Sequence, residues 1–184
     1  MDSDLTLDFI IIIVLIIANG LFSMTELAIV NAKKRKLEEL AEAGNERAKK
    51  AFELAENPND MFSTIQIGIT LVGILTGLYS GATFSGPLEE ILTANIPSIE
   101  PYAASVSSFL IVAIITYLSL VIGELVPKRL ALNSPEGIAV VVAKPIYWLS
   151  VALKPIVSFL GISTELLLKI LGVTVKEEAP VTES

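Results

Sequence analysis

The sequence predicts an all-α integral membrane protein with three transmembrane helices, a cytoplasmic helical pair and a juxtamembrane helical belt. Of its 184 residues, 53% are hydrophobic, and the mean hydropathy is +0.70. Residues 9–25, 61–88 and 101–123 carry no charged side chain. Each segment is long enough, or nearly so, to cross a hydrocarbon layer about 30 Å thick. The charges lie between these segments, which is typical of a membrane protein and not of a soluble core.

The composition restricts the chemistry that the protein can perform. The chain contains neither cysteine nor histidine, which excludes disulfides, thiolate metal sites and the commonest zinc ligand and general base. A bound metal must therefore be held by oxygen atoms, which favours a hard cation such as Mg²⁺, Ca²⁺ or Na⁺. The net charge of −7 argues against nucleic-acid binding. We expect no enzymatic activity, because only a serine–lysine arrangement remains and no lysine lies at depth in the membrane.

The first predicted span covers residues 9–31 and follows an acidic N-terminal segment. Because no basic region precedes it and no small-residue cleavage site follows, it is expected to be a retained helix and not a signal peptide. Residues 32–57 are charged, with apolar residues at helical spacing, and are interrupted by Gly44-Asn45. This pattern predicts two short surface helices.

The second span covers about residues 61–82 and contains four glycines, which predicts close packing against neighbouring helices. An irregular loop with three prolines is expected over residues 83–101, and the third span covers about residues 102–126. Residues 133–172 are apolar but contain two Lys-Pro pairs. We predict a juxtamembrane belt of proline-broken helices along the cytoplasmic interface. A kinked fourth crossing is the alternative.

The basic residues predict the orientation in the membrane. Residues 32–60 contain seven lysines and arginines, whereas the loop between the second and third spans contains none. By the positive-inside rule the N-terminus lies outside and residues 32–60 lie in the cytoplasm. Lys128 and Arg129, after the third span, also lie inside. The chain is therefore predicted to be a multi-pass protein of the cell membrane, plasma or inner, with a cytoplasmic C-terminus.

The third span ends in the sequence Gly-Glu-Leu-Val-Pro at residues 123–127. Glu124 places a carboxylate in an apolar helix, where an ionised side chain costs roughly 2.5–3.5 kcal/mol on insertion scales. Pro127 has no N–H, so the carbonyl of Gly123, four residues earlier, loses its helical donor. Two such oxygens side by side predict a cation site. The structural alternative is an ion pair between Glu124 and Lys128, one turn further on.

Polar residues on the first two spans also share helix faces. On the first span these residues are Asn19, Ser23 and Glu26, and on the second span they are Ser63, Gln66 and Thr70. Together with Gly123 and Glu124 they present oxygen ligands that suit a hard cation. Other roles remain open, because serine and threonine in membrane helices often bond to their own backbone or to neighbouring helices. Glu26 can equally pair with a basic residue of the following helix.

Four motifs in this order are similar to a known family. They are residues 19–28, the Gly44-Asn45 break, residues 63–70 and residues 123–128. Together they resemble the transmembrane domain of the CorC/CNNM magnesium transporters, over nearly the whole chain. The resemblance implies a homodimer with three crossings per subunit and magnesium export coupled to sodium entry. It also implies a magnesium site formed by Ser23, Ser63, Gly123 and Glu124, with Asn19 and Gln66 as further candidates.

The resemblance also implies a division of the chain into domains. Residues 1–176 would form the transmembrane domain, and residues 177–184 would begin a linker to a pair of cytosolic CBS modules. The expected ligands are Mg²⁺ and, as coupling ion, Na⁺. The expected partners are a second subunit, the lipid membrane and the CBS modules, with Pro127 in a structural role at the site. The alternative function is a non-transporting magnesium sensor that regulates another carrier.

Overall fold

The structure is a computed structural model that describes residues 2–172, and every secondary-structure element in that range is helical. In chain order the elements are α1 (Asp2–Asn31), α2 (Lys34–Glu42), α3 (Glu46–Glu56), α4 (Asn59–Asn95), η1 (Pro97–Tyr102), α5 (Ala103–Leu120), η2 (Val121–Leu125), α6 (Val126–Asn133) and α7 (Pro135–Ile170). The predicted all-α class is confirmed. The predicted linker at residues 177–184 lies outside the described residues.

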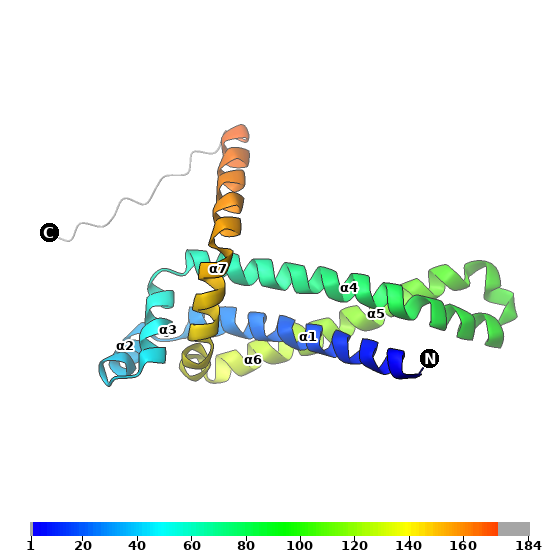
Figure 1. Ribbon diagram of the computed structural model, residues 1–184, viewed down its shortest axis with the longest axis horizontal. Helices are drawn as coiled ribbons and strands as arrows, with labels where there is room; N and C mark the ends of the chain where they lie inside the picture. The colour runs from blue at the N-terminus through cyan, green and yellow to red at the C-terminus, as the bar shows by residue number, and fades with distance from the viewer. Residues whose placement is uncertain (1, 173–184) are drawn as a thin grey trace.

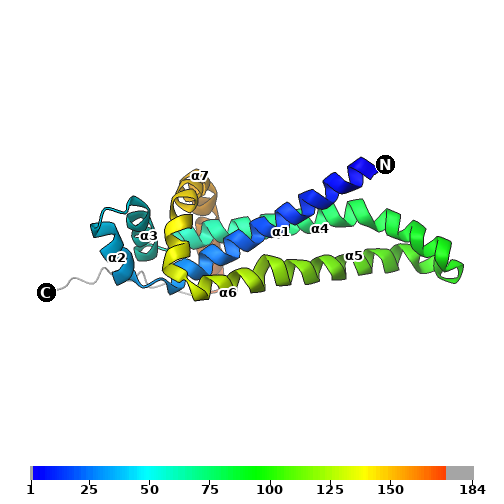
Figure 2. The same cartoon turned by 90° about the horizontal axis from the view of Figure 1, so that it is seen from below.

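Three long helical segments run side by side along the longest axis of the molecule (Figures 1 and 2). They are α1, α4 and the continuous run from α5 through η2 to α6, and α4 contacts both of the others. Each is long and apolar enough to cross a membrane, and each carries many exposed large apolar side chains. Such side chains are compatible with lipid and not with water. The chain is therefore a multi-pass membrane protein.

The second helix is longer than the sequence predicted. α4 extends to Asn95, so most of the loop expected over residues 83–101 is helical, and η1 makes the turn into α5. Pro87 lies inside α4, and the helix bends toward its C-terminal end (Figure 2). The prediction was wrong because proline was interpreted as a loop signal, whereas membrane helices accommodate proline by a bend and local rearrangement of hydrogen bonds.

The four glycines of the second span do not share one role. A Cβ atom on Gly68 would lie 2.6 Å from the ring of Phe22, so α1 and α4 meet closely there. A Cβ atom on Gly73, Gly77 or Gly81 would meet no atom of another helix within 4 Å among the described residues. Only Gly68 supports the predicted close packing within the described chain.

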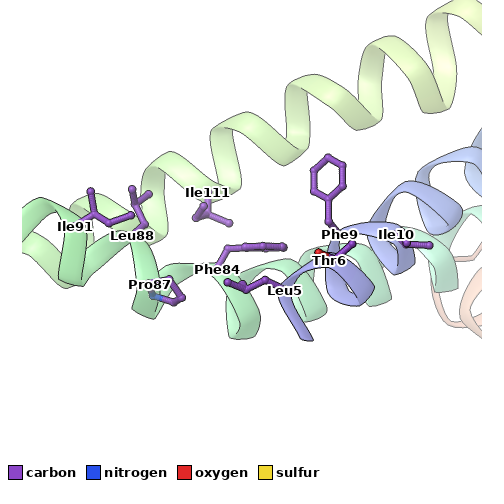
Figure 3. Close-up of a pocket in the computed structure, with 9 residues that line it drawn as sticks. All are labelled: Leu5, Thr6, Phe9, Ile10, Phe84, Pro87, Leu88, Ile91 and Ile111. Carbon is purple, nitrogen blue, oxygen red and sulfur yellow. The ribbon is translucent and has the colours of Figure 1, made fainter. Parts of the chain in front are cut away.

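α1 diverges from α5 toward its N-terminus, at the end of the molecule opposite to α2 and α3 (Figure 2). The resulting opening is a pocket of about 520 Å³ between α1, α4 and α5. Phe9, Phe84 and Ile111 are among the side chains that line it (Figure 3). Its lining carries no charged side chain, so this pocket is not suited to an ion.

The predicted pair of short helices between the first two membrane segments forms. Gly44 adopts a φ of +91°, which favours glycine, and ends the first helix of the pair. The Asn45 side chain then caps α3, because its Oδ1 accepts hydrogen bonds from the N–H groups of Arg47 at 3.0 Å and Ala48 at 3.1 Å. Buried residues of α2, α3, α4 and α7, including Leu37 and Met61, form the core at this end.

α7 runs across the end of the bundle instead of alongside it (Figure 1). It is one bent helix of 36 residues that contains Pro145 and Pro155, and not the series of broken helices that was predicted. It is also long and apolar enough to span a membrane, so four helices qualify by length and composition. α7 runs across the bundle axis (Figure 1), which is the direction expected of a helix along the membrane interface. The number of spans, three or four, stays a prediction.

Glu136, a residue that the sequence did not draw attention to, fixes α7 to the start of α2. Its side chain is only 11% exposed. Oε1 accepts a hydrogen bond from the Lys33 N–H at 3.4 Å, and Oε2 lies 3.5 Å from Lys36 Nζ. An anion is favoured at the N-terminus of a helix, so this carboxylate anchors the start of α7 at the end of the membrane bundle where α1 stops.

Candidate cation site

The third membrane segment does not continue as a regular α-helix. η2 is a π-helical turn, and the Val126 N–H donates to the Val121 carbonyl, five residues earlier. The next residue, Pro127, has no N–H to donate. The carbonyls of Ile122 and Gly123 therefore both lose the donor that an α-helix would provide. The sequence predicted the effect at Gly123, whereas the π-turn and the second freed carbonyl are new findings.

Asn19 of α1 reaches the carbonyl of Gly123. Its Nδ2 donates a hydrogen bond to the Gly123 oxygen at 3.1 Å, between residues 104 positions apart. The other atom of this amide, Oδ1, is buried and has no hydrogen-bond partner among the described residues. A buried acceptor without a hydrogen-bond partner lowers the stability of the folded protein by about 1–3 kcal/mol. Asn19 Oδ1 is therefore a polar atom for which a bound cation would supply the missing partner.

Two glycines allow α1 to approach η2 this closely. A Cβ atom on Gly20 would lie 2.9 Å from Pro127 Cγ and 3.1 Å from the Ile122 oxygen. A Cβ atom on Gly123 would lie 3.2 Å from both Asn19 Nδ2 and the Ile16 oxygen. Gly20 was not among the predicted site residues, although it directly follows Asn19. Its role is to leave room for the proline ring at the site.

Glu124 forms an ion pair with Lys128. Lys128 Nζ lies 2.6 Å from Glu124 Oε1, and the two side chains are 36% and 39% exposed, respectively. The ion pair that the sequence offered as the structural alternative is therefore present. Both oxygen-bearing groups of this turn already have a donor within the protein, because Asn19 donates to Gly123 as Lys128 donates to Glu124.

Ser23 follows Asn19 along α1. It is buried and lies one helical turn after Asn19, on the face where Gly20 meets Pro127. Glu26 lies about one turn further and is half-buried. The structure thus brings the predicted residue Asn19 to the turn that carries Gly123 and Glu124, and it buries Ser23 one turn further along α1.

Ser63 and Gln66 are placed differently. They line a groove of about 600 Å³ between the start of α4 and the C-terminal half of α7, together with Asp60 and Glu165. The neighbouring residue Thr64, by contrast, is fully buried and donates to the Asp60 carbonyl. A shared site that includes Ser63 and Gln66 therefore stays a prediction, since the observed contacts group these two residues with α7.

Residues 10–184 match a known family, described as the cyclin M transmembrane N-terminal domain. The chain belongs to this family. The resemblance deduced from the four motifs is thereby confirmed, and the membrane domain of the CNNM family accounts for almost the whole sequence. The π-turn, the paired carboxylate and the Asn19 contact are therefore features of a CNNM transmembrane domain.

Several relatives of this CNNM domain are longer proteins. UPF0053 protein sll0260 of Synechocystis is 50% identical over 181 residues, which are 98% of this chain and 40% of that protein. UPF0053 protein YugS of Bacillus subtilis is 33% identical, with 96% of this chain and 41% of the relative covered. The polyamine export protein of Escherichia coli K12 is 28% identical, with 81% and 33% covered. The chain thus spans about two fifths of these relatives or less.

Replacing Pro127 by alanine should weaken the site without removing a ligand atom. The new N–H can donate to the Gly123 carbonyl and close an ordinary α-helical bond, in competition with Asn19 and with a bound ion. Because one hydrogen bond is worth about 1 kcal/mol, we expect the affinity for Mg²⁺, the ion that the family resemblance implies, to fall about three- to ten-fold. Calorimetric titration of the folded variant checks this. Unchanged affinity would mean that the Gly123 carbonyl is not a ligand.

Proposed function

We propose that this protein is a magnesium transporter that exports Mg²⁺ in exchange for Na⁺ and binds the ion where α1 meets η2. One observation carries the proposal. At the end of a membrane segment, the Gly123 carbonyl has lost its helical donor to Pro127, the neighbouring Glu124 supplies a carboxylate, and the Asn19 amide that contacts Gly123 has a buried oxygen with no hydrogen-bond partner among the described residues. All are oxygen ligands, the kind that a hard divalent cation prefers. The functional unit that we propose is a homodimer.

The proposed ligands are the Asn19 amide oxygen, the Ser23 hydroxyl, the Gly123 carbonyl and the Glu124 carboxylate. Mg²⁺ requires near-octahedral oxygen coordination and loses water reluctantly, so waters or Ser63 and Gln66 of α4 would complete the set. The amide of Asn19 now donates through Nδ2. A half-turn of this amide would present Oδ1 instead, which is a ligand for the ion and no longer needs a donor.

Two alternatives compete with magnesium export. A magnesium sensor that regulates another carrier would use the same ligands without moving the ion. Polyamine export is suggested by the names of relatives that are 27–28% identical. One observation favours an amine cargo, because Glu124 already binds the primary ammonium group of Lys128 at 2.6 Å. A linear polyamine carries the same group at its ends.

Flux measurements on the protein in sealed liposomes separate the three. Mg²⁺ entry or exit that depends on an imposed Na⁺ gradient supports the exporter. Mg²⁺ binding without flux supports the sensor. Transport of labelled spermidine without Mg²⁺ flux supports an amine exporter, and each of the last two results would overturn the proposed function.

Adding Mg²⁺ should raise the melting temperature of the detergent-solubilised protein. A ligand that binds only the folded state at 100 times its Kd stabilises by about 2.7 kcal/mol, or roughly 5–10 °C for a domain of this size. Ca²⁺ should raise it less, because Ca²⁺ takes six to eight oxygen ligands at longer distances. A thermal melt with each ion makes the comparison. An equal or larger shift with Ca²⁺ would contradict a magnesium-selective site.

A further inference from the structure

We propose that the ammonium group of Lys128 acts as a built-in competitor of the cargo ion. It pairs with the Glu124 carboxylate in the cargo-free protein, and the cargo ion displaces it on binding. The inference rests on the proposed function in one respect, namely that the cargo binds at Glu124. It adds a residue that repels the cargo instead of coordinating it. Lys128 would then set how tightly the ion is held and help to release it.

The geometry supports an exchange of one cation for another. Lys128 lies in α6, one helical turn after Glu124, and its Nζ is 2.6 Å from Oε1. The pair forms within one continuous helical run, so it needs no other element to assemble. Both side chains are a little over one-third exposed, so an ion that arrives from the end of the bundle can reach the carboxylate.

The position of this pair distinguishes it from the exposed pair between Arg35 and Glu39. Arg35 and Glu39 also form a pair at this spacing, but their side chains are 89% and 61% exposed. Glu124 instead follows the apolar third span directly and belongs to the π-turn. An unpaired carboxylate is costly in such surroundings. The lysine therefore neutralises a charge that the membrane segment would otherwise have to carry alone.

The Lys128 side chain is suited to move away from the Glu124 carboxylate and to return to it. Its ammonium group is a compact charge on a flexible four-carbon stem, and such stems extend toward the membrane interface. A divalent ion and an ammonium group repel each other when both contact one carboxylate, so binding of the ion favours withdrawal of Lys128. Asn19 acts in parallel, because its Nδ2 holds the Gly123 carbonyl until the amide turns.

This role predicts the opposite sign to that of a purely structural ion pair. If the pair only stabilises the helix end, removing Lys128 leaves Mg²⁺ affinity unchanged or lowers it through local disorder. If Lys128 competes with the cargo, its removal raises Mg²⁺ affinity. The stability of the cargo-free protein falls in either case, so the two measurements must be made together.

The test measures Mg²⁺ binding by calorimetry and the melting temperature without Mg²⁺ for the parent chain and its variants. We expect Lys128→Gln to bind Mg²⁺ about three- to ten-fold more tightly, or roughly 0.6–1.4 kcal/mol, and to melt below the parent temperature without the ion. Lys128→Met preserves the apolar stem and should behave alike. Lys128→Arg keeps the charge and should show no such gain in affinity.

The adjacent, exposed Arg129 provides the matched control. Arg129→Gln removes the same charge one position away and should leave the affinity near that of the parent. An equal gain in Mg²⁺ affinity in Lys128→Gln and Arg129→Gln would mean that only long-range charge matters, which would overturn the inference. Parent-like or weaker Mg²⁺ binding by Lys128→Gln and Lys128→Met would overturn it as well. Glu124→Ala distinguishes a failure of the Lys128 inference from a failure of the proposed cation site. If it still binds Mg²⁺ as the parent does, the proposed site itself is wrong.

Discussion

Glu124→Ala is expected to abolish measurable Mg²⁺ binding and transport. The other proposed ligands are neutral oxygens, and neutral groups alone cannot offset the cost of stripping water from a divalent ion. Removing the charged member of such a site costs about 3 kcal/mol or more, which corresponds to at least about a hundred-fold loss of affinity. Calorimetry on the detergent-solubilised protein and flux in liposomes measure the two effects.

Two further variants define what the loss means. Glu124→Gln keeps the shape and one carbonyl oxygen, so the protein should fold normally and lose most of its affinity. Glu165→Ala removes a carboxylate from the groove between α4 and α7 and should bind as the parent does. The reverse result, with binding lost in Glu165→Ala and retained in Glu124→Ala, would move the site to the groove that contains Ser63 and Gln66.

Gly20→Ala is expected to disrupt the site by adding a single methyl group. That carbon would lie 2.9 Å from Pro127 Cγ and 3.1 Å from the Ile122 oxygen, so α1 must move away from η2. Overpacking of this kind costs about 1–3 kcal/mol. The movement also stretches the hydrogen bond from Asn19 to Gly123. We expect a lower melting temperature, by roughly 2–12 °C, together with a marked loss of Mg²⁺ affinity.

Gly73→Ala is the matched control for this substitution. It makes the same change in a neighbouring membrane helix, at a position where a Cβ atom would meet no atom of another described helix within 4 Å. Because alanine is a better helix former than glycine by about 1 kcal/mol, Gly73→Ala should be neutral or slightly stabilising. If Gly20→Ala matched it in both stability and affinity, the close approach of α1 to η2 would not matter to the site.

Local sequence was sufficient for the features that depend on one segment at a time. The charge-free apolar segments predicted membrane helices because hydrocarbon excludes both charge and unpaired backbone groups. Gly44-Asn45 predicted a break between two helices, since glycine tolerates a positive φ and asparagine caps the next helix. Pro127 predicted a freed carbonyl at Gly123 because the missing N–H is a property of the residue itself.

Helix lengths were less predictable, because a membrane changes the meaning of proline. Pro87 lies within α4, and Pro145 and Pro155 lie within α7. In water each would favour the end of a helix. In an apolar environment the remaining backbone groups have no water to bond with, so the helix continues past the proline and bends.

The arrangement of the site depends on contacts between distant parts of the chain. Asn19 meets Gly123 across 104 residues, and nothing in the periodicity of either segment specifies that pair. The close approach of α1 to Pro127 and Ile122 explains why Gly20 must lack a side chain, and no such approach occurs at Gly73 within the described chain. Helical spacing places polar groups on a face, but only the packing of α1 against η2 determines which donor reaches which oxygen. A hydrogen bond depends on distances of a few tenths of an ångström, and those distances exist only once the helices have packed.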